Sequence, residues 1–553
     1  MKHLIFISAI FLQMFCNLSV HAQIDTKGTD FWVTFGRNLG TQTEYQIRIV
    51  GGEQSATGNI YFTSLNSSVP FFVAAGQVFT YSLNASEKSA AANTSAGTRN
   101  SSVHITSSAP VTAYALNQQQ ASTDATNILP ITALGTEYYH MSYTVYSSTY
   151  PDAFSVIATE NNTGVYFNNS LVTTLNTGQV YCRTSTIDMT GSHISADKPV
   201  AFFAMSNGVQ IPFGQTFIDI LYQQLAPVNT WGTHFFVPVS YRSRDIVRIV
   251  ASQNGTNITQ SGGTLLSPTG GQTSLINLNA GQWVELMVSL TNKGCFISAD
   301  KPVGVCTYLA SQGYNNSLFP GIPASSDPAQ AWMPSIEQTV HSALIAPFIP
   351  SGTTQLDAHY ALIITSTATK NNTTIKIGAG ADLPLSGGTW NDHSSGYSFY
   401  SMQLTATTSA YQFTNLDAGL IVMGYGTGSA ESYYYLASSA MRSLDAAFYV
   451  NEVHFQDLET EDYCSSDLLT FRVDVQGDLS SIPGHLKWYI DNVEQADVRD
   501  VFTWDTILPA GVYQIKIEAL MDDNVTTKTE EATLTIDACM QAVDDRATTP
   551  DSL

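Results

Sequence analysis

Three residue types that support nucleophilic catalysis occupy alternate positions of one predicted strand: His193, Ser195 and Asp197. Such a set works in hydrolases when the histidine lies between a serine hydroxyl and a carboxylate. Alternate residues of a strand share a face, but their side chains stand parallel and do not converge. The related segment about 100 residues later has Phe296 where the histidine stood. We therefore interpret these three residues as structural.

Other motifs that carry chemistry are missing from the sequence. It has no Gly-x-Ser-x-Gly elbow, no His-Glu-x-x-His pair, no phosphate-binding loop and no Asp-x-Asp-x-Asp-Gly calcium loop. The run Gly424-Tyr425-Gly426-Thr427-Gly428 lies between two predicted strands, which favours a turn because a dinucleotide site needs a helix there. We predict no catalytic residue, no metal and no cofactor, and we expect that the protein is not an enzyme.

Two cysteines lie symmetrically about a predicted turn. Cys295 and Cys306 flank Asp300-Lys301, where we predict that the chain reverses, so they should face each other on antiparallel strands. That geometry suits a disulfide, and we predict one. Cys182 has no evident partner, and we expect it to be buried and unreactive.

Two predicted loops combine aromatic side chains with arginines, which protein interfaces favour. Repeat-built scaffolds usually carry function in such loops. The predicted ligand-binding residues are Tyr241, Arg242, Arg244, Tyr314 and Phe319. Trp231 lies nearby, but we expect it to pack in the core.

The elements that position these loops belong to an internal repeat. Ile-Ser-Ala-Asp-Lys-Pro-Val occupies 194–200 and again 297–303, with weaker copies at 105–111 and 415–420. A second landmark keeps the same period of about 100 residues: Ala75-Gly76-Gln77, Thr177-Gly178-Gln179 and Ala280-Gly281-Gln282. These landmarks predict four copies of one unit over residues 23–445.

Each copy is predicted to consist of antiparallel strands rich in Val, Ile, Thr, Tyr and Phe, with Asp-Lys turns joining the last two strands. No stretch after residue 22 has helical periodicity. Continuous apolar runs such as 200–205 and 420–423 indicate strands covered on both faces. This pattern favours a propeller-like ring, while tandem β-sandwiches remain an open alternative.

The two ends of the chain differ from the repeats. Residues 1–22 resemble a signal peptide, with Lys2, an apolar run and Ala22 before the predicted cleavage. Residues 446–541 predict an immunoglobulin-like β-sandwich with Trp488 in its core. Cys464 and Cys539 enclose this module, and we predict a disulfide between them. Residues 542–553 are polar, and we expect a disordered tail.

Charge is sparse and acidic. The formal net charge is −23 and charged residues make up 12% of the chain. Such a chain repels phosphate backbones, so we exclude nucleic acid as a partner. No segment after the leader is long and apolar enough to predict a membrane span.

Several of these motifs together resemble the IgGFc-binding protein N-terminal domain family. They are Gly28-Thr29-Asp30-Phe31-Trp32 after the leader, the Asp-Lys-Pro-Val motifs, and Gln224-Leu225-Ala226-Pro227 leading to Trp231-Gly232. The resemblance covers about residues 24–445. It implies an extracellular, repeat-built module that binds other macromolecules. The fourth copy departs from the pattern, with Asp417-Ala418-Gly419 in place of Asp-Lys-Pro.

We therefore expect a secreted or cell-surface binding or adhesion protein. Its partner would be an extracellular protein or glycoprotein, such as a mucus component or an immunoglobulin. The alternative is a structural or assembly component of the cell surface without a host ligand. A glycan-active enzyme is a third and distant reading, which would require two facing carboxylates in one cleft.

Overall fold

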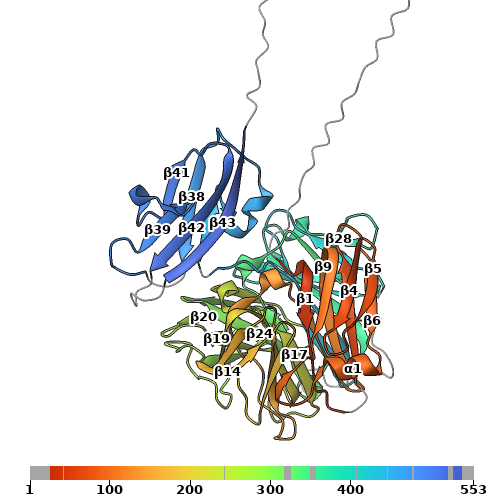
Figure 1. Cartoon of the computed structure of the whole chain (residues 1–553). Coiled ribbons are helices and arrows are strands. Elements are labelled where there is room, and N and C mark those ends of the chain that lie inside the picture. The colour runs from red at the N-terminus through yellow and green to blue at the C-terminus, as the bar shows by residue number, and fades with distance from the viewer. Residues whose placement is uncertain are drawn as a thin grey trace, which may run out of the picture.

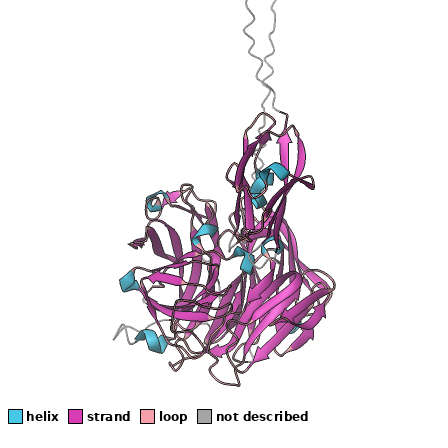
Figure 2. Cartoon of the chain, turned by 90° about the vertical axis from the view of Figure 1, so that its left-hand side faces the viewer, coloured by secondary structure: helices cyan, strands magenta, loops and turns pink. Residues whose placement is uncertain are grey.

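The structure is a computed structural model that describes residues 25–40, 43–241, 243–316, 326–348, 356–406, 408–444, 446–475, 479–520 and 527–538. Strands dominate these ranges (Figure 2), which confirms the predicted all-β class. In the described part of the chain, two α-helices occur, α1 (Ala85–Ala91) and α2 (Gln312–Asn316). No helix in those ranges has the length and hydropathy needed to cross a membrane.

Helix α1 corrects the prediction that no helix follows the leader. The Asn84 side chain accepts the backbone N–H groups of Ser86 and Glu87, and the Glu87 carboxylate accepts the N–H of Asn84. This reciprocal cap stabilises a short helix. Two turns are too short to produce a periodic apolar pattern, so the cap was the only available signal.

One long strand organises the first segment of the chain, residues 25–128. The first part of β9 (Val103–Gln119) pairs with β1 (Lys27–Val33) and β4 (Ala56–Phe62). Its second part pairs with β3 (Glu44–Gly51) and β10 (Ser122–Ile128). β5 (Ser67–Val73) and β6 (Val78–Ser82) extend the outer edges. Residues 111–118 of β9 are all buried, which is typical of a strand covered on both faces.

A similar order of pairing recurs in the following three segments. The place of β9 is taken by β16 in the second segment, by β23 and β24 in the third, and by β32 and β33 in the fourth. The second segment contains β11 (Gly135–Tyr139), β12 (Asp152–Ala158), β13 (Thr163–Phe167), β14 (Ser170–Leu175), β15 (Val180–Ser185), β16 (His193–Val209) and β17 (Asp219–Gln224). The third contains β18 (His234–Val237), β19 (Arg244–Ala251), β20 (Ile258–Ser261), β21 (Gly263–Leu265), β22 (Trp283–Ser289), β23 (Cys295–Ala299), β24 (Val303–Leu309) and β25 (Ala329–Met333). The fourth contains β26 (Ser342–Ile345), β27 (Leu356–Ser366), β28 (Thr374–Ile377), β29 (Leu383–Pro384), β30 (Gly388–Asp392), β31 (Tyr397–Leu404), β32 (Tyr411–Thr414), β33 (Ile421–Gly428) and β34 (Glu431–Ser438).

The Asp-Lys-Pro motif is not a hairpin turn, which corrects a prediction. In the second segment it lies inside β16, and in the third it carries the chain from β23 in one sheet to β24 in another. Cys295 therefore pairs with Val237, whereas Cys306 pairs with Arg248 and Trp332. Both thiols are free, so the predicted Cys295–Cys306 disulfide is wrong. The chain bends between two layers at the proline and does not turn back on itself.

The last strands of the four segments pack against one another in sequence. β10 contacts β17, β17 contacts β25, β25 contacts β34, and β34 contacts β10. The buried Asp124 carboxylate joins all four strands, because it accepts the backbone N–H groups of Ala125, Tyr222, Gln330 and Tyr434 at 2.8, 2.9, 3.1 and 3.2 Å. The first and fourth segments thus meet directly (Figure 1, red and teal).

Residues at the beginning of the first segment also join the end of the fourth. The Thr26 N–H donates to the Ser439 carbonyl at 3.2 Å, and Asp25 forms a β-bridge with Ala440. The Thr26 hydroxyl lies 3.2 Å from that of Ser438. We call these contacts the closing strap.

Residues 446–538 form a separate unit of two sheets, drawn in blue in Figure 1. One sheet contains β36 (Val453–His454), β35 (Ala446–Val450), β38 (Leu469–Val475) and β41 (Thr503–Thr506), and the other contains β37 (Tyr463–Cys464), β43 (Thr527–Asp537), β42 (Gly511–Leu520), β39 (Leu486–Ile490) and β40 (Val493–Glu494). Trp488 is fully buried between Phe448 and Phe471. Cys464 pairs in β37 with Asp537, while Cys539 lies outside the described residues, so their disulfide stays a prediction.

Candidate functional site

Of the five predicted ligand-binding residues, Arg244 and Tyr314 contact each other, and Tyr241 lies in the turn that precedes Arg244. The Arg244 guanidinium lies 5.3 Å from the centre of the Tyr314 ring, and the Tyr241 side chain is 50% exposed. Arg242 and Phe319 lie outside the described residues. Trp231 is buried as predicted, and its indole N–H donates to the Ala226 carbonyl at 3.2 Å.

Tyr241 belongs to a surface shared by two segments. Its ring stacks on Tyr360 of β27, with the ring centres 5.7 Å apart, and Tyr360 stacks on Tyr425 of β33 at 5.0 Å. The backbone N–H of Tyr241 donates to the Tyr425 hydroxyl at 2.8 Å. An exposed aromatic ring is thus fixed over the junction of the third and fourth segments. Sequence reasoning missed Tyr360, because nothing local links it to Tyr241.

A buried carboxylate holds this loop, which we call the Tyr241 turn (residues 240–241 and 243–245). Asp245 accepts the Ser240 backbone N–H at 2.8 Å and the Ser240 hydroxyl at 2.5 Å. The Arg244 backbone N–H donates to the Asn315 side chain at 3.2 Å, which ties the turn to α2. Burial raises the pKa of Asp245 to about 6, against the opposing effect of the Ser240 hydrogen bonds. The turn is therefore sensitive to protonation.

Replacing Asp245 with asparagine should remove a pH dependence of stability. The folded-state pKa exceeds the unfolded value of 3.8, so the stabilising contribution is full below about pH 4 and declines as the pH rises through about 6. Asp245→Asn mimics the protonated form and should gain about 2–3 kcal/mol relative to the natural chain between pH 4 and 7. Urea unfolding at each pH measures this difference, with the exposed Asp497→Asn as the control. Parallel stability curves for D245N and the natural chain would contradict the prediction.

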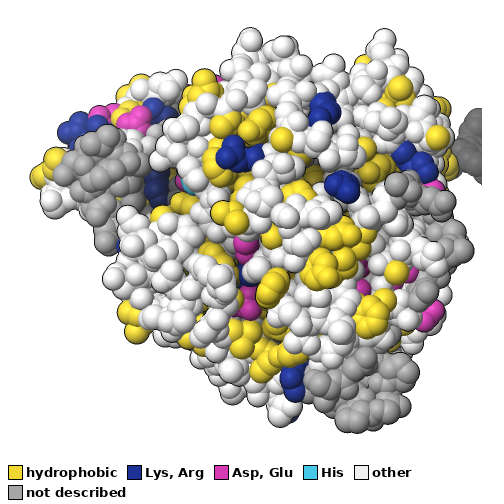
Figure 3. All heavy atoms as spheres, turned by 90° about the horizontal axis from the view of Figure 1, so that it is seen from below, with side chains coloured by type: hydrophobic (Ala, Val, Ile, Leu, Met, Phe, Trp, Pro, Cys, Tyr) yellow, Lys and Arg dark blue, Asp and Glu magenta, His cyan; other side chains and the backbone are white. Residues whose placement is uncertain are grey.

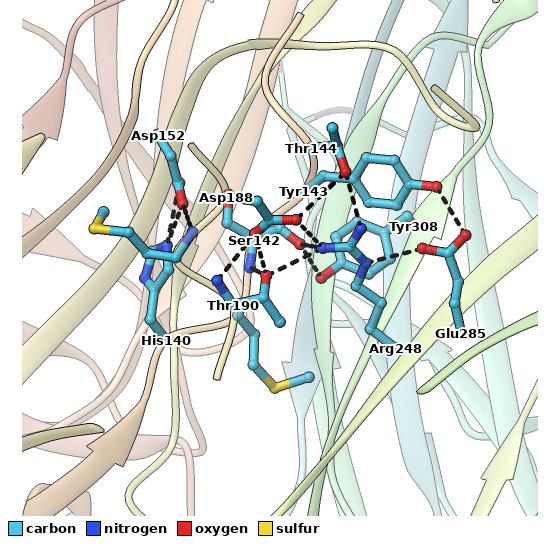
Figure 4. Close-up of polar contacts among 12 residues, drawn as sticks. His140, Ser142, Tyr143, Thr144, Asp152, Asp188, Thr190, Arg248, Glu285 and Tyr308 are labelled. Carbon is cyan, nitrogen blue, oxygen red and sulfur yellow. Dashed lines mark hydrogen bonds and ion pairs between the residues drawn. The ribbon is translucent and has the colours of Figure 1, made fainter. Parts of the chain in front are cut away.

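A fully buried arginine lies at the junction of the second and third segments (Figure 4). The Arg248 Nε donates to Glu285 at 2.9 Å, and its Nη1 donates to Asp188 at 2.7 Å. The guanidinium lies 4.0 Å from the ring centres of both Tyr143 and Trp283. Two carboxylates and two aromatic faces thus enclose one cation.

The charged groups of this cluster pair with one another across the junction. Burial alone lowers the pKa of Arg248, but the Asp188 and Glu285 carboxylates outweigh it, and the net direction is upward. Burial raises the pKa of Asp188, but the Arg248 charge and the hydrogen bonds from Thr190 and Arg248 together lower it by more. The pKa of Asp188 therefore falls below its usual value. The charged forms are therefore favoured, and the guanidinium side chain is fully buried.

Two histidines of the second segment contact carboxylates. His140 Nε2 lies 3.1 Å from both carboxylate oxygens of Asp152 (Figure 4), and both side chains are fully buried. His193 contacts Glu137 at 2.8 Å, whereas Asp197 accepts the Gly164 N–H at 2.9 Å. The His193 and Asp197 side chains, which look like parts of a triad in sequence, therefore bind different partners. Among the residues that the structure describes, no group of three or more His, Cys, Asp or Glu side chains is placed to hold a metal ion.

Two comparisons bear on the family. A family model described as IgGFc binding protein matches residues 124–426, more than half of the 553-residue chain. The IgGFc-binding protein of Homo sapiens is 30% identical over 203 residues, which cover 34% of this chain. The chain spans about 4% of the length of that human protein.

Proposed function

Because this chain belongs to the IgGFc binding protein family, we propose that it is a secreted or cell-surface protein that binds an extracellular protein or glycoprotein. The observation that carries the proposal is the Tyr241 turn, where an exposed tyrosine and an arginine–tyrosine pair stand on packed strands. Rigid aromatic and arginine side chains are frequent centres of protein interfaces. Binding of this kind needs no catalytic group, and the proposal includes that this protein is not an enzyme.

The proposal includes an architecture. Residues 23–445 are four copies of one unit closed into a ring, which the recurring strand order and the successive contacts of β10, β17, β25 and β34 support. Residues 446–541 are an immunoglobulin-like module, which the two sheets around Trp488 support. The proposed signal peptide, residues 1–22, and the proposed disordered tail, residues 542–553, lie outside the described ranges.

The surface suits recognition of a macromolecule by contacts other than charge. The face seen in Figure 3 carries few charged side chains among many uncharged ones, in keeping with a chain of only 12% charged residues. Immunoglobulin Fc is the first ligand to test, since the name of the human relative specifies it. Mucus glycoproteins are the second.

The test measures binding of the purified chain to immobilised immunoglobulin Fc and to mucus glycoproteins. The double variant Tyr241→Ala/Arg244→Ala should lose at least about tenfold in affinity, since each residue is a typical interface anchor. Tyr146→Ala is the matched control, because Tyr146 is 44% exposed and lies in the second segment, with its ring centre 6.1 Å from that of Tyr150. Unchanged affinity of the double variant would remove the Tyr241 turn as the site. Binding to neither ligand, together with retention in a surface complex, would favour the structural role instead.

A further inference from the structure

A cavity of about 720 Å³ lies where the first and fourth segments meet. The first segment lines it with residues 25, 27, 52–54, 75–76 and 110, and the fourth with residues 340–342, 344, 376, 378–380, 410 and 412. Its volume falls in the range of small-molecule sites. It shares no lining residue with the Tyr241 turn, so it is a second and independent place where this chain could hold a ligand. We call it the seam cavity.

Two lysines line the seam cavity, and one of them has no ion pair among the described residues. Lys27 is paired with Asp25 at 3.1 Å, and the Asp25 side chain is almost fully buried. The Lys376 side chain, in contrast, makes no ion pair and no hydrogen bond to a described residue, and the residue is only partly buried. Glu53 is exposed. In a chain with 45 acidic and 22 basic residues, an unpaired lysine lining a cavity points to an anionic ligand.

The walls combine apolar side chains, such as Val340 and Leu344, with hydrogen-bonding groups of the backbone and of polar side chains. At positions 52, 76, 378 and 380 the lining residue is glycine, so no side chain covers the backbone there. The N–H groups of Gly52 and Ala379 donate to no described residue. A Cβ at Gly76 would stand 3.0 Å from the Gly378 carbonyl oxygen, so the two loops touch there.

The side chains that line the seam cavity suit a ligand rich in hydroxyl groups. The Gln412 amide donates to the Ser342 hydroxyl at 2.8 Å, which leaves the Gln412 carbonyl and the Ser342 O–H for a ligand. The lining contains no Phe, Tyr or Trp, and His341 is its one aromatic residue.

We propose that the seam cavity binds a saccharide that carries a carboxylate, with Lys376 as the anchor for the carboxylate. A lysine and free backbone N–H groups recognise the charge, while the amide and hydroxyl side chains recognise sugar hydroxyls. This function is independent of macromolecular binding at the Tyr241 turn, and either one can fail without the other.

Calorimetric titration of the purified chain with glucuronic acid and with glucose tests the ligand class. The two sugars differ only at the carboxylate, so glucuronic acid should bind and glucose should bind at least about tenfold more weakly. Glucuronic acid binding should also weaken in about 0.5 M NaCl, because salt screens the lysine. Triglycine with a free carboxyl end is the competing ligand, and binding of triglycine without glucuronic acid would overturn the saccharide assignment.

Two variants with opposite changes of charge test the site. Lys376→Gln should lower glucuronic acid affinity about tenfold, Lys376→Arg should largely restore it, and Glu53→Gln should raise it by removing a repulsive charge. Ala379→Trp should block the cavity without changing its charge. Lys293→Gln is the control, since Lys293 is an exposed lysine outside the cavity. Equal affinity for the two sugars, no binding of either, or an unchanged affinity of K376Q would overturn the proposal.

Discussion

Arg248→Met should be among the most destabilising single substitutions in this chain, at about 3–5 kcal/mol. Methionine keeps much of the arginine's length but leaves Glu285 and Asp188 beside a fully buried position without their cation. An uncompensated buried charge costs far more than the loss of one hydrogen bond. Thermal and urea unfolding, at a pH where both carboxylates are ionised, measure the effect.

A companion variant separates charge from packing. If the cost of R248M comes from unpaired carboxylates, then Arg248→Met/Asp188→Asn/Glu285→Gln should recover part of the lost stability. Arg183→Met is the matched control, because the Arg183 guanidinium stacks 4.0 Å from the centre of the Phe167 ring in a partly exposed setting. A loss below about 1 kcal/mol for R248M, equal to that of the control, would show that the cluster does not hold the junction.

Asp124→Asn should have the second large effect, about 2–4 kcal/mol. The natural carboxylate uses two oxygens to accept four backbone N–H groups, one each from β10, β17, β25 and β34. An asparagine offers one oxygen and turns an NH2 group towards the remaining two donors, which are then buried without an acceptor. Because the lost bonds join all four segments, the four segments should separate more easily.

Limited proteolysis together with urea unfolding measures this loosening. D124N should be cleaved between segments faster than the natural chain, at protease concentrations where the exposed Asp357→Asn variant is unaffected. If D124N unfolds and is cleaved like the Asp357→Asn control, the four N–H groups find other acceptors. That result would contradict the central role assigned to Asp124.

Much of the fold could be predicted because its signals are local. The turn landmarks were correct: Gly76, Gly178 and Gly281 have φ of 66°, 79° and 79°, a conformation that favours glycine. The Asp-Lys-Pro motif was wrongly predicted to be a hairpin turn for the same reason. A local signal cannot distinguish a turn that reverses the chain from a bend that carries the chain from one sheet to another. The wrong disulfide followed from that single error.

The candidate site was only partly predictable. Tyr241, Arg244 and Tyr314 were found because aromatic and arginine residues in a predicted loop are a local pattern. The Arg248 cluster was missed because its partners come from another segment. A signal was nevertheless present: Val247-Arg248-Ile249 places a charge inside an apolar strand, as Ile47-Arg48-Ile49 does in the first segment. Both arginines are fully buried, so a charge in such a run predicts an interior cation, which Arg248 pairs with Asp188 and Glu285.

The closing strap has a consequence for how the protein is made. Thr26 is synthesised early, yet its partners Ser438 and Ser439 emerge from the ribosome only after more than four hundred further residues. Until then β10 lacks β34, and the Asp124 carboxylate lacks the Tyr434 N–H that it binds in the folded chain. Contacts of such long sequence separation form slowly. A newly made chain is therefore most vulnerable to proteases and to wrong partners just before its final quarter arrives, and a holding chaperone at that moment should raise the yield.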